Sequence, residues 1–124
     1  MKILNMSLHK LNLSEKAENI EIIEPTIEEK SSLFIDFNKM INDEYRAEVL
    51  INIAKVINKY KEDVDAVYIA GAIAAGMAVA IISEIYGLKP VCGIINNKKE
   101  IISVYPLYTY SGLDRKLRME IEHL

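Results

Sequence analysis

The sequence predicts a single α/β domain spanning residues 1–124, with a mainly parallel central sheet and flanking helices. Strand-like and helix-like segments alternate through the middle of the chain, and one of these strands, residues 65–71, is a continuous apolar run. Such a run is typical of a parallel sheet that is covered on both faces. A chain of 124 residues, 51% apolar and 27% charged, is long enough for one core and too short for two.

Two short strands are expected near the N-terminus. The run "KILNMS" (2–7) ends in polar residues, and "NIEIIEP" (19–25) is stopped by Pro25. Between them, Ser14 could cap one turn of helix. The sequence leaves residues 27–43 undecided, because "SSLFIDF" fits a strand as well as the start of a helix.

The segment "DEYRAEVLINIAKVINKYKED" (43–63) has the spacing of an amphipathic helix, with Asp43 as its N-cap. Its expected buried face comprises Ala47, Leu50, Ile51, Ala54, Ile57 and Tyr60. The arginine, lysine and glutamate side chains lie elsewhere on the helix. The helix is therefore expected to pack one side on the sheet.

The second half of the chain continues the alternation. The strand at 65–71 is followed by an apolar helix that ends at Gly87, a residue suited to a left-handed C-cap. Strands at 89–95 and 100–107 flank the turn "NNKK" (96–99), and a terminal helix follows, with Ser111 as its expected cap. The order β-β-α-β-α-β-β-α predicts a Rossmann-type sandwich, in which ligands bind outside the carboxyl ends of the strands.

Composition and charge narrow the function classes. A net charge of −3 argues against a broad grip on duplex nucleic acid, although a local anion site remains possible. Glycines interrupt the apolar run from Val67 to Ser83, so we expect no membrane span, and we also expect no secretion signal in the stretch "MKILNMSLHK". A lone Cys92 fits a buried position in a protein of the reducing cytoplasm, and no metal-ligand set stands out.

Two loops that follow expected strands are candidates for a ligand site. In "AGAIAAG" (70–76), Gly71 permits a tight turn, after which the amides of residues 71–74 could hold a phosphate at the start of a helix; close packing of strand on helix is the alternative. In "NMSLHK" (5–10), Ser7 could offer a hydroxyl to a phosphate and His9 a proton acceptor. A solvated loop is the alternative there.

The apolar helix at 72–87 lacks a polar side. A helix that lies on a sheet with its back in water needs one apolar stripe, so the other side requires a cover. A second copy of the chain would provide it in a two-fold homodimer; residues 27–43 folding over the helix would be the alternative within one subunit. Tyr105, Tyr108 and Tyr110 fit either packing or stacking against a base.

Three patches carry a family resemblance: "ILNMSLHKL" (3–11), "VYIAGAIAAGMAVAIISEIYGLKPVCGI" (67–94) and "IISVYPLYTYSGLDRKLRMEIEH" (101–123). Together they resemble the small, single-domain CRISPR-associated proteins of type III systems, Rossmann-like relatives of CARF domains that bind or linearise cyclic oligoadenylate. In the family the serine and histidine of the first loop adjoin, whereas Leu8 separates Ser7 from His9 here. The second loop also lacks the prolines that the family often carries there.

The resemblance implies a metal-independent ring nuclease that binds cyclic tetra-adenylate and linearises it, which switches off the antiviral signal. Ser7 and His9 would be catalytic, and no cofactor would be needed. A homodimer, or a higher assembly formed with the ligand, would match the symmetry of the ring. The implied ligand contacts are Asn5, Ser7, His9, Lys10, Ala70, Gly71, Ala72, Ile73, Gly76 and Tyr105.

Three functions therefore stay open at this point. The first is the ring nuclease, and the second is a receptor or sponge that binds the cyclic nucleotide without cleaving it. The third is a dimerising α/β module that works by protein contact through its apolar helix.

Overall fold

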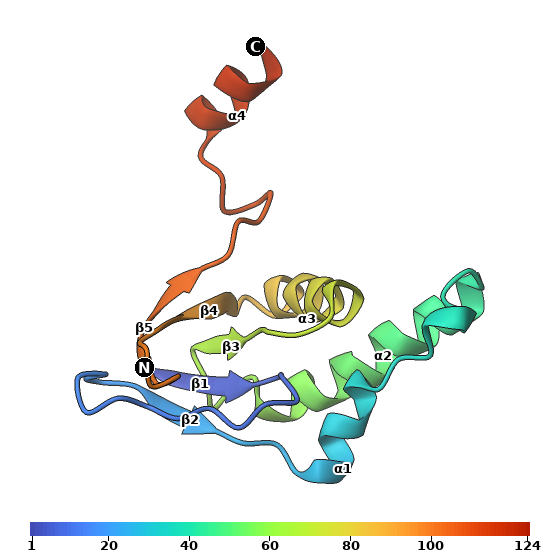
Figure 1. The fold of residues 1–124 in the computed structure, drawn as a ribbon. Helices are drawn as coiled ribbons and strands as arrows, with labels where there is room; N and C mark the ends of the chain where they lie inside the picture. Colours follow the sequence, from blue (N-terminus) through green and yellow to red (C-terminus); the bar gives the residue numbers. More distant parts are fainter.

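The computed structural model describes residues 1–124 and contains one five-stranded mixed sheet (Figure 1). The strands are β1 (Lys2–Asn5), β2 (Glu21–Ile23), β3 (Ala66–Tyr68), β4 (Lys89–Ile95) and β5 (Ile101–Pro106), in the spatial order β2-β1-β3-β4-β5. The first four strands are parallel and β5 is antiparallel to β4. The predicted α/β class and the mainly parallel sheet are confirmed.

The helices are α1 (Ile27–Lys30), α2 (Asp43–Tyr60), α3 (Ile73–Ile85) and α4 (Arg115–Glu122), with two 3-10 turns at Ser31–Leu33 and Phe37–Lys39. The predicted order of the main elements is confirmed. The undecided segment 27–43 forms α1 and the 3-10 turns. The helix α3 ends just before Gly87, whose φ of 73° lies in the left-handed region, as expected for this glycine. None of the helices combines the length and hydrophobicity that crossing a membrane requires.

One face of the sheet is covered by α2 and α3, which pack against each other. The α2 residues in this core are Val49, Ile53, Val56 and Ile57, and they meet Val79 and Ile82 of α3. The predicted face of α2 is thus partly wrong, because Ile51 is exposed and Ile53 is buried. Apolar residues occupy a wide arc of this helix, and the position of α3 decides which of them become buried.

Two predicted helix caps are corrected by their hydrogen bonds. Asn42, and not Asp43, caps α2, since its side-chain oxygen accepts from the amide of Tyr45. Asp114, and not Ser111, caps α4 through the amide of Leu117. In both helices the capping side chain reaches the third residue of the first turn, the geometry that satisfies a free amide.

The opposite face of the sheet is covered without a helix. Its small core comprises Ile3, Ala66, Tyr68, Val91 and Ile101, with Leu11 and Leu13 packed against it. Leu13 forms an isolated parallel bridge with Ile101, although β5 is the far edge of the sheet, so the sheet curls over this face. The possible helix at Ser14 is a single turn, in which Ser14 O accepts from the amide of Ala17.

The outer side of α3 is uncovered in the chain. Residues 27–39 pack beside α2, where Leu33 joins the core, so the alternative in which they fold over α3 is wrong. After β5 the chain leaves the body, and α4 projects away from it (Figure 1). No residue of α4 is buried.

Candidate functional site

The carboxyl ends of β1 and β3 lie side by side and are joined by a bond from the amide of Met6 to Tyr68 O, 3.1 Å. The chain leaves β1 toward β2 on one side, whereas β3 lies on the other side of β1. Connections that diverge from neighbouring parallel strands leave a crevice outside their carboxyl ends. The structure thus brings the two candidate loops together at such a point.

Asn5 and Ser7 form a buried hydrogen-bond network within the first loop. The Asn5 amide donates to His9 O and to Glu24 Oε1, both at 2.8 Å, and its Oδ1 accepts from the Ser7 amide and hydroxyl, the latter at 2.7 Å. Both side chains are essentially inaccessible to solvent. Because their polar atoms are engaged within the chain, their role in this structure is to shape the loop. His9 and Lys10 are left exposed at its tip.

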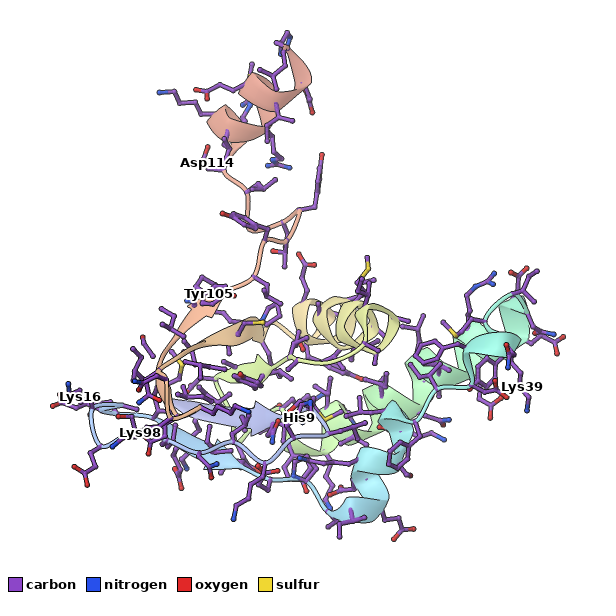
Figure 2. All side chains as sticks on the ribbon, in the orientation of Figure 1. His9, Lys16, Lys39, Lys98, Tyr105 and Asp114 are labelled. Atoms are coloured by element: carbon purple, nitrogen blue, oxygen red, sulfur yellow. The ribbon has the colours of Figure 1, made fainter.

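A hollow of about 330 Å³ lies beside this loop and has a basic rim. His9 and Lys10 contribute to it from the first loop, and Lys99 contributes from the turn between β4 and β5. Figure 2 shows His9 near the end of β1. Lys99 was expected only in an exposed turn, because nothing in the local sequence indicates that the curl of the sheet carries this turn toward His9. We refer to this cavity as the basic hollow.

The second loop leads into a helix without a side-chain cap. Gly71 has a φ of 101°, and Ala72 at the N-cap position cannot accept a hydrogen bond from the amides that follow. The first bond of this helix runs from the amide of Gly76 to Ala72 O, and no bond ties the amides of residues 73–75 to another group of the chain. An anion at this position would accept hydrogen bonds from these amides and would be favoured by the helix dipole.

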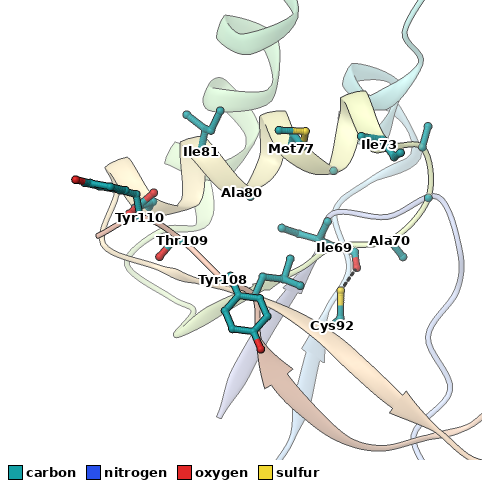
Figure 3. Close-up of a pocket in the computed structure, with 15 residues that line it drawn as sticks. Ile69, Ala70, Ile73, Met77, Ala80, Ile81, Cys92, Tyr108, Thr109 and Tyr110 are labelled. Carbon is teal, nitrogen blue, oxygen red and sulfur yellow. Dashed lines mark hydrogen bonds between the residues drawn. The ribbon is translucent and has the colours of Figure 1, made fainter. Parts of the chain in front are cut away.

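A larger hollow of about 640 Å³ lies between α3 and the chain that follows β5 (Figure 3). Most of its lining is apolar, including Met77 and Ile81, and Tyr108 and Tyr110 lie on its opposite side with their rings largely exposed. We refer to this cavity as the apolar hollow. At its floor Cys92 Sγ donates to Ile69 O at 3.1 Å, and burial raises the pKa of this thiol, which keeps it protonated.

The two hollows lie on opposite faces of the sheet, since Tyr68 lines the basic one and the next residue, Ile69, lines the apolar one, and Ala70 at the end of β3 lines both. Of the predicted ligand residues, His9 and Lys10 line the basic hollow, while Gly71, Ala72, Ile73 and Gly76 line the apolar one. Asn5 and Ser7 are buried in the first loop, and Tyr105 is on β5, paired with Cys92 and lining neither hollow. Met77 and Ile81 were not predicted as site residues, because an apolar helix face has the same sequence pattern whether it packs against protein or binds a ligand.

The chemistry of this crevice is that of a binding site for a ligand with both anionic and apolar parts. Cationic side chains line the basic hollow, whereas the start of α3, with its free amides, borders the aromatic and aliphatic surface of the apolar hollow. His9 is the one histidine in it. Burial raises the pKa of Tyr68 at the base of the basic hollow, so its hydroxyl stays neutral at physiological pH. No group of three or more His, Cys, Asp or Glu side chains is placed to hold a metal ion.

Comparison with known proteins adds no family: no family model matches the chain, and neither a curated protein nor a solved structure does so.

Proposed function

We propose that this protein binds a cyclic oligoadenylate, with cyclic tetra-adenylate as the first candidate, in the crevice formed by the two hollows. The observation that carries the proposal is the meeting of a basic and an apolar, tyrosine-bearing hollow at Ala70, outside the ends of β1 and β3. A nucleotide has the same two halves, a phosphate and a flat aromatic base. The resemblance of the three patches to CARF-like proteins, and with it a Rossmann-type relationship, is part of this proposal.

The phosphates would lie between the first loop and the start of α3. The free amides of residues 73–75 supply donors, and Lys10 and Lys99 supply positive charge from the basic hollow across the end of β3. This explains how a chain with a net charge of −3 can bind a polyanion locally. The adenines would lie on the apolar hollow, where Tyr108 and Tyr110 offer stacking surfaces.

Cleavage, as part of the proposal, needs no group beyond those in the crevice. A ribose 2′-oxygen attacks the adjacent phosphorus, the bond to the 5′-oxygen breaks, and this oxygen leaves as a hydroxyl after it takes a proton from water, which regains one from the protonated His9. The product is linear with a 2′,3′-cyclic phosphate. His9 takes the 2′-hydroxyl proton, and Lys10 steadies the charge on the phosphate. Ser7 acts as a positioning residue, because its hydroxyl donates to Asn5 and holds the loop that presents His9. Holding the attacking oxygen in line would provide most of the acceleration.

The buried hydroxyl of Ser7 favours a second form of the proposal, a receptor that binds without turnover. One incubation separates the two forms. Radiolabelled cyclic tetra-adenylate is mixed with the protein and a chelator and is run on native and denaturing gels. A shifted band with linear product supports the nuclease, a shifted band with intact ligand supports the receptor, and no shift contradicts both. In either form the protein would work in the cytoplasm.

Two neighbouring lysines provide a matched test of the site. Lys99 lines the basic hollow, whereas Lys98 lies in the same turn and faces a different depression. Lys99→Gln should weaken binding of cyclic tetra-adenylate by about fivefold, the effect of about one exposed ion pair. Lys98→Gln should leave it unchanged. Equal effects of the two substitutions would mean that only general charge matters.

If turnover occurs, His9→Ala should lower it by about 10²-fold or more while binding is kept.

A further inference from the structure

Two apolar surfaces of this chain have no partner within it. The first, the α3 stripe, consists of Ile73, Met77, Ile81 and Ile85, which are 50 to 79% exposed. Figure 3 shows the first three along one side of the helix. The second, the α4 stripe, consists of Leu113, Leu117, Ile121 and Leu124, which recur at the spacing of one helix face.

The helix α4 needs a partner to be stable. It has eight residues, none of them buried, whereas isolated helices shorter than about 12 residues are marginal in water. Its strong amphipathic pattern shows which side would be covered, because Leu117 and Ile121 lie on one face and Met119 on the other.

Local contacts direct α4 away from its own body. A turn is closed by bonds from the amides of Gly112 and Leu113 to the carbonyls of Thr109 and Tyr110, and Asp114 caps the helix directly after it. The Arg118 guanidinium lies 5.1 Å from the centre of the Tyr110 ring, which ties the helix to the turn. These local contacts therefore hold the arm 107–124 in one shape. Its apolar face is not folded back on its own α3 (Figure 1).

The two stripes match in length, pattern and charge. Each has four side chains spaced mainly four residues apart, the pattern that lets the ridges of two helices interlock, although in the α4 stripe only Leu117 and Ile121 lie within the helix itself. Glu84 is the one charged residue of α3, while Lys116 and Arg118 flank Leu117, and Glu120 and Glu122 flank Ile121. Opposite charges would meet at the edge of the apolar contact where the Leu117 end of α4 lies beside Glu84.

We propose that the α4 stripe of one copy packs on the α3 stripe of a second copy, and the reverse, which closes a two-fold dimer by exchange of the C-terminal arms. Because Met77 and Ile81 belong to both the α3 stripe and the lining of the apolar hollow, the partner's α4 forms the outer wall of that hollow. The site is incomplete in one chain. This proposal does not depend on the identity of the ligand.

The oligomeric state of the full chain without ligand tests it. Sedimentation velocity should give twice the chain mass of 14.1 kDa. Leu117→Asp and Met77→Glu should each weaken association by at least about thirtyfold, the loss typical of a central interface residue. Met119→Glu, on the opposite side of α4, is the matched control and should leave the dimer intact. A monomeric parent, or a Leu117→Asp variant that dimerises like the parent, would overturn the proposal.

A cross-link distinguishes exchange from folding back. In a Cys92→Ser background, cysteines replacing Met77 and Leu117 in one chain should oxidise to covalent dimers on a non-reducing gel. Bonds within single chains would contradict the exchange. Mixing the Leu117→Asp and Met77→Glu variants should restore association in part, since each mixed pair has one intact contact. No restoration would also count against it.

Discussion

The helices α2 and α3 cover the same face of one sheet and touch each other, yet they differ in their first turns and in their outer sides. α2 has a side-chain cap from Asn42, acidic residues Asp43 and Glu44 in its first turn, and a largely polar outer side. α3 has no side-chain cap, no acidic residue in its first turn, and an apolar outer side.

This contrast separates stability from binding. The start of α2 is capped by a side chain of its own chain, and its apolar residues apart from Ala47 and Ile51 are buried or half-buried. The amides at the start of α3 and the α3 stripe are left for something outside the chain. We infer that α2 supports the fold, whereas α3 presents its N-terminus to a ligand and its outer side to a second copy.

The largest effect on the free energy of unfolding should come from replacing a buried isoleucine with alanine, compared with the same change at an exposed one. Ile53 of α2 is fully buried and Ile73 of α3 is 79% exposed. Ile53→Ala should lower the free energy of unfolding by about 2–5 kcal/mol, since it leaves a cavity. Ile73→Ala, studied in the Leu117→Asp background to remove contact between copies, should cost less than about 0.5 kcal/mol. Urea unfolding measures both, and equal costs would contradict the division of roles.

Two glycines next to α3 provide a sharper comparison. Gly71 and Gly87 both have positive φ, 101° and 73°, and a Cβ at either would meet no atom within 4 Å. Alanine should therefore cost about 1–2 kcal/mol of stability at each, through backbone strain alone. Only Gly71→Ala should also weaken binding of cyclic tetra-adenylate, because it turns the amides at the start of the helix. A binding loss in Gly87→Ala as well would indicate general damage.

Sequence patterns predicted the sheet well because its signals are local. The strand at 89–95 and the end of α3 before Gly87 follow from apolar runs and a glycine at a helix end. The segment 27–43 could not be predicted, since it has short 3-10 turns with Phe34 and Phe37 exposed. The caps were each misplaced by one to three residues, because several polar residues compete at each helix start.

The candidate site was predictable only as two loops. Spacing alone could place "NMSLHK" and the Gly71 turn after strands, and the parallel pairing of β1 with β3 brings the two loops to the same end of the sheet. The burial of Asn5 and Ser7 was not predictable, because it depends on Glu24 and on the chain that covers the loop. Lys99 reaches the basic hollow through the curl of the sheet, which is a long-range feature.

Exchanging the cap properties of the two helices should have an effect of about 1 kcal/mol. Ala72 has the extended backbone of an N-cap residue, so Ala72→Asp should stabilise the chain by about 1 kcal/mol, while Asn42→Ala should destabilise it by a similar amount. Isothermal titration should show weaker ligand binding for Ala72→Asp alone, because the carboxylate occupies the amides and repels phosphate. Ala72→Ser, a cap without charge, is the control and should weaken binding less.

A stability effect of similar size, which depends on pH, is expected on the α2 side. Glu29 accepts hydrogen bonds from the Tyr60 hydroxyl and the Thr26 amide and lies 2.9 Å from Lys59 Nζ, and these contacts lower its pKa from 4.5 to about 2. Between these two values the unfolded chain binds more protons than the folded one, so the stabilisation is complete above about pH 4.5 and is lost as the pH falls to about 2.

Glu29→Gln should therefore lower the free energy of unfolding at pH 7 by about 1 kcal/mol, a modest value because solvent screens the contacts. The difference from the parent should shrink below pH 4.5 and vanish near pH 2, as followed by urea unfolding across that range. A difference that does not change with pH would show that the capping bonds to Thr26, and not the charge, carry the effect. Because Glu29 ties α1 to α2 and does not line either hollow, binding of cyclic tetra-adenylate at pH 7 should be unchanged in the variant.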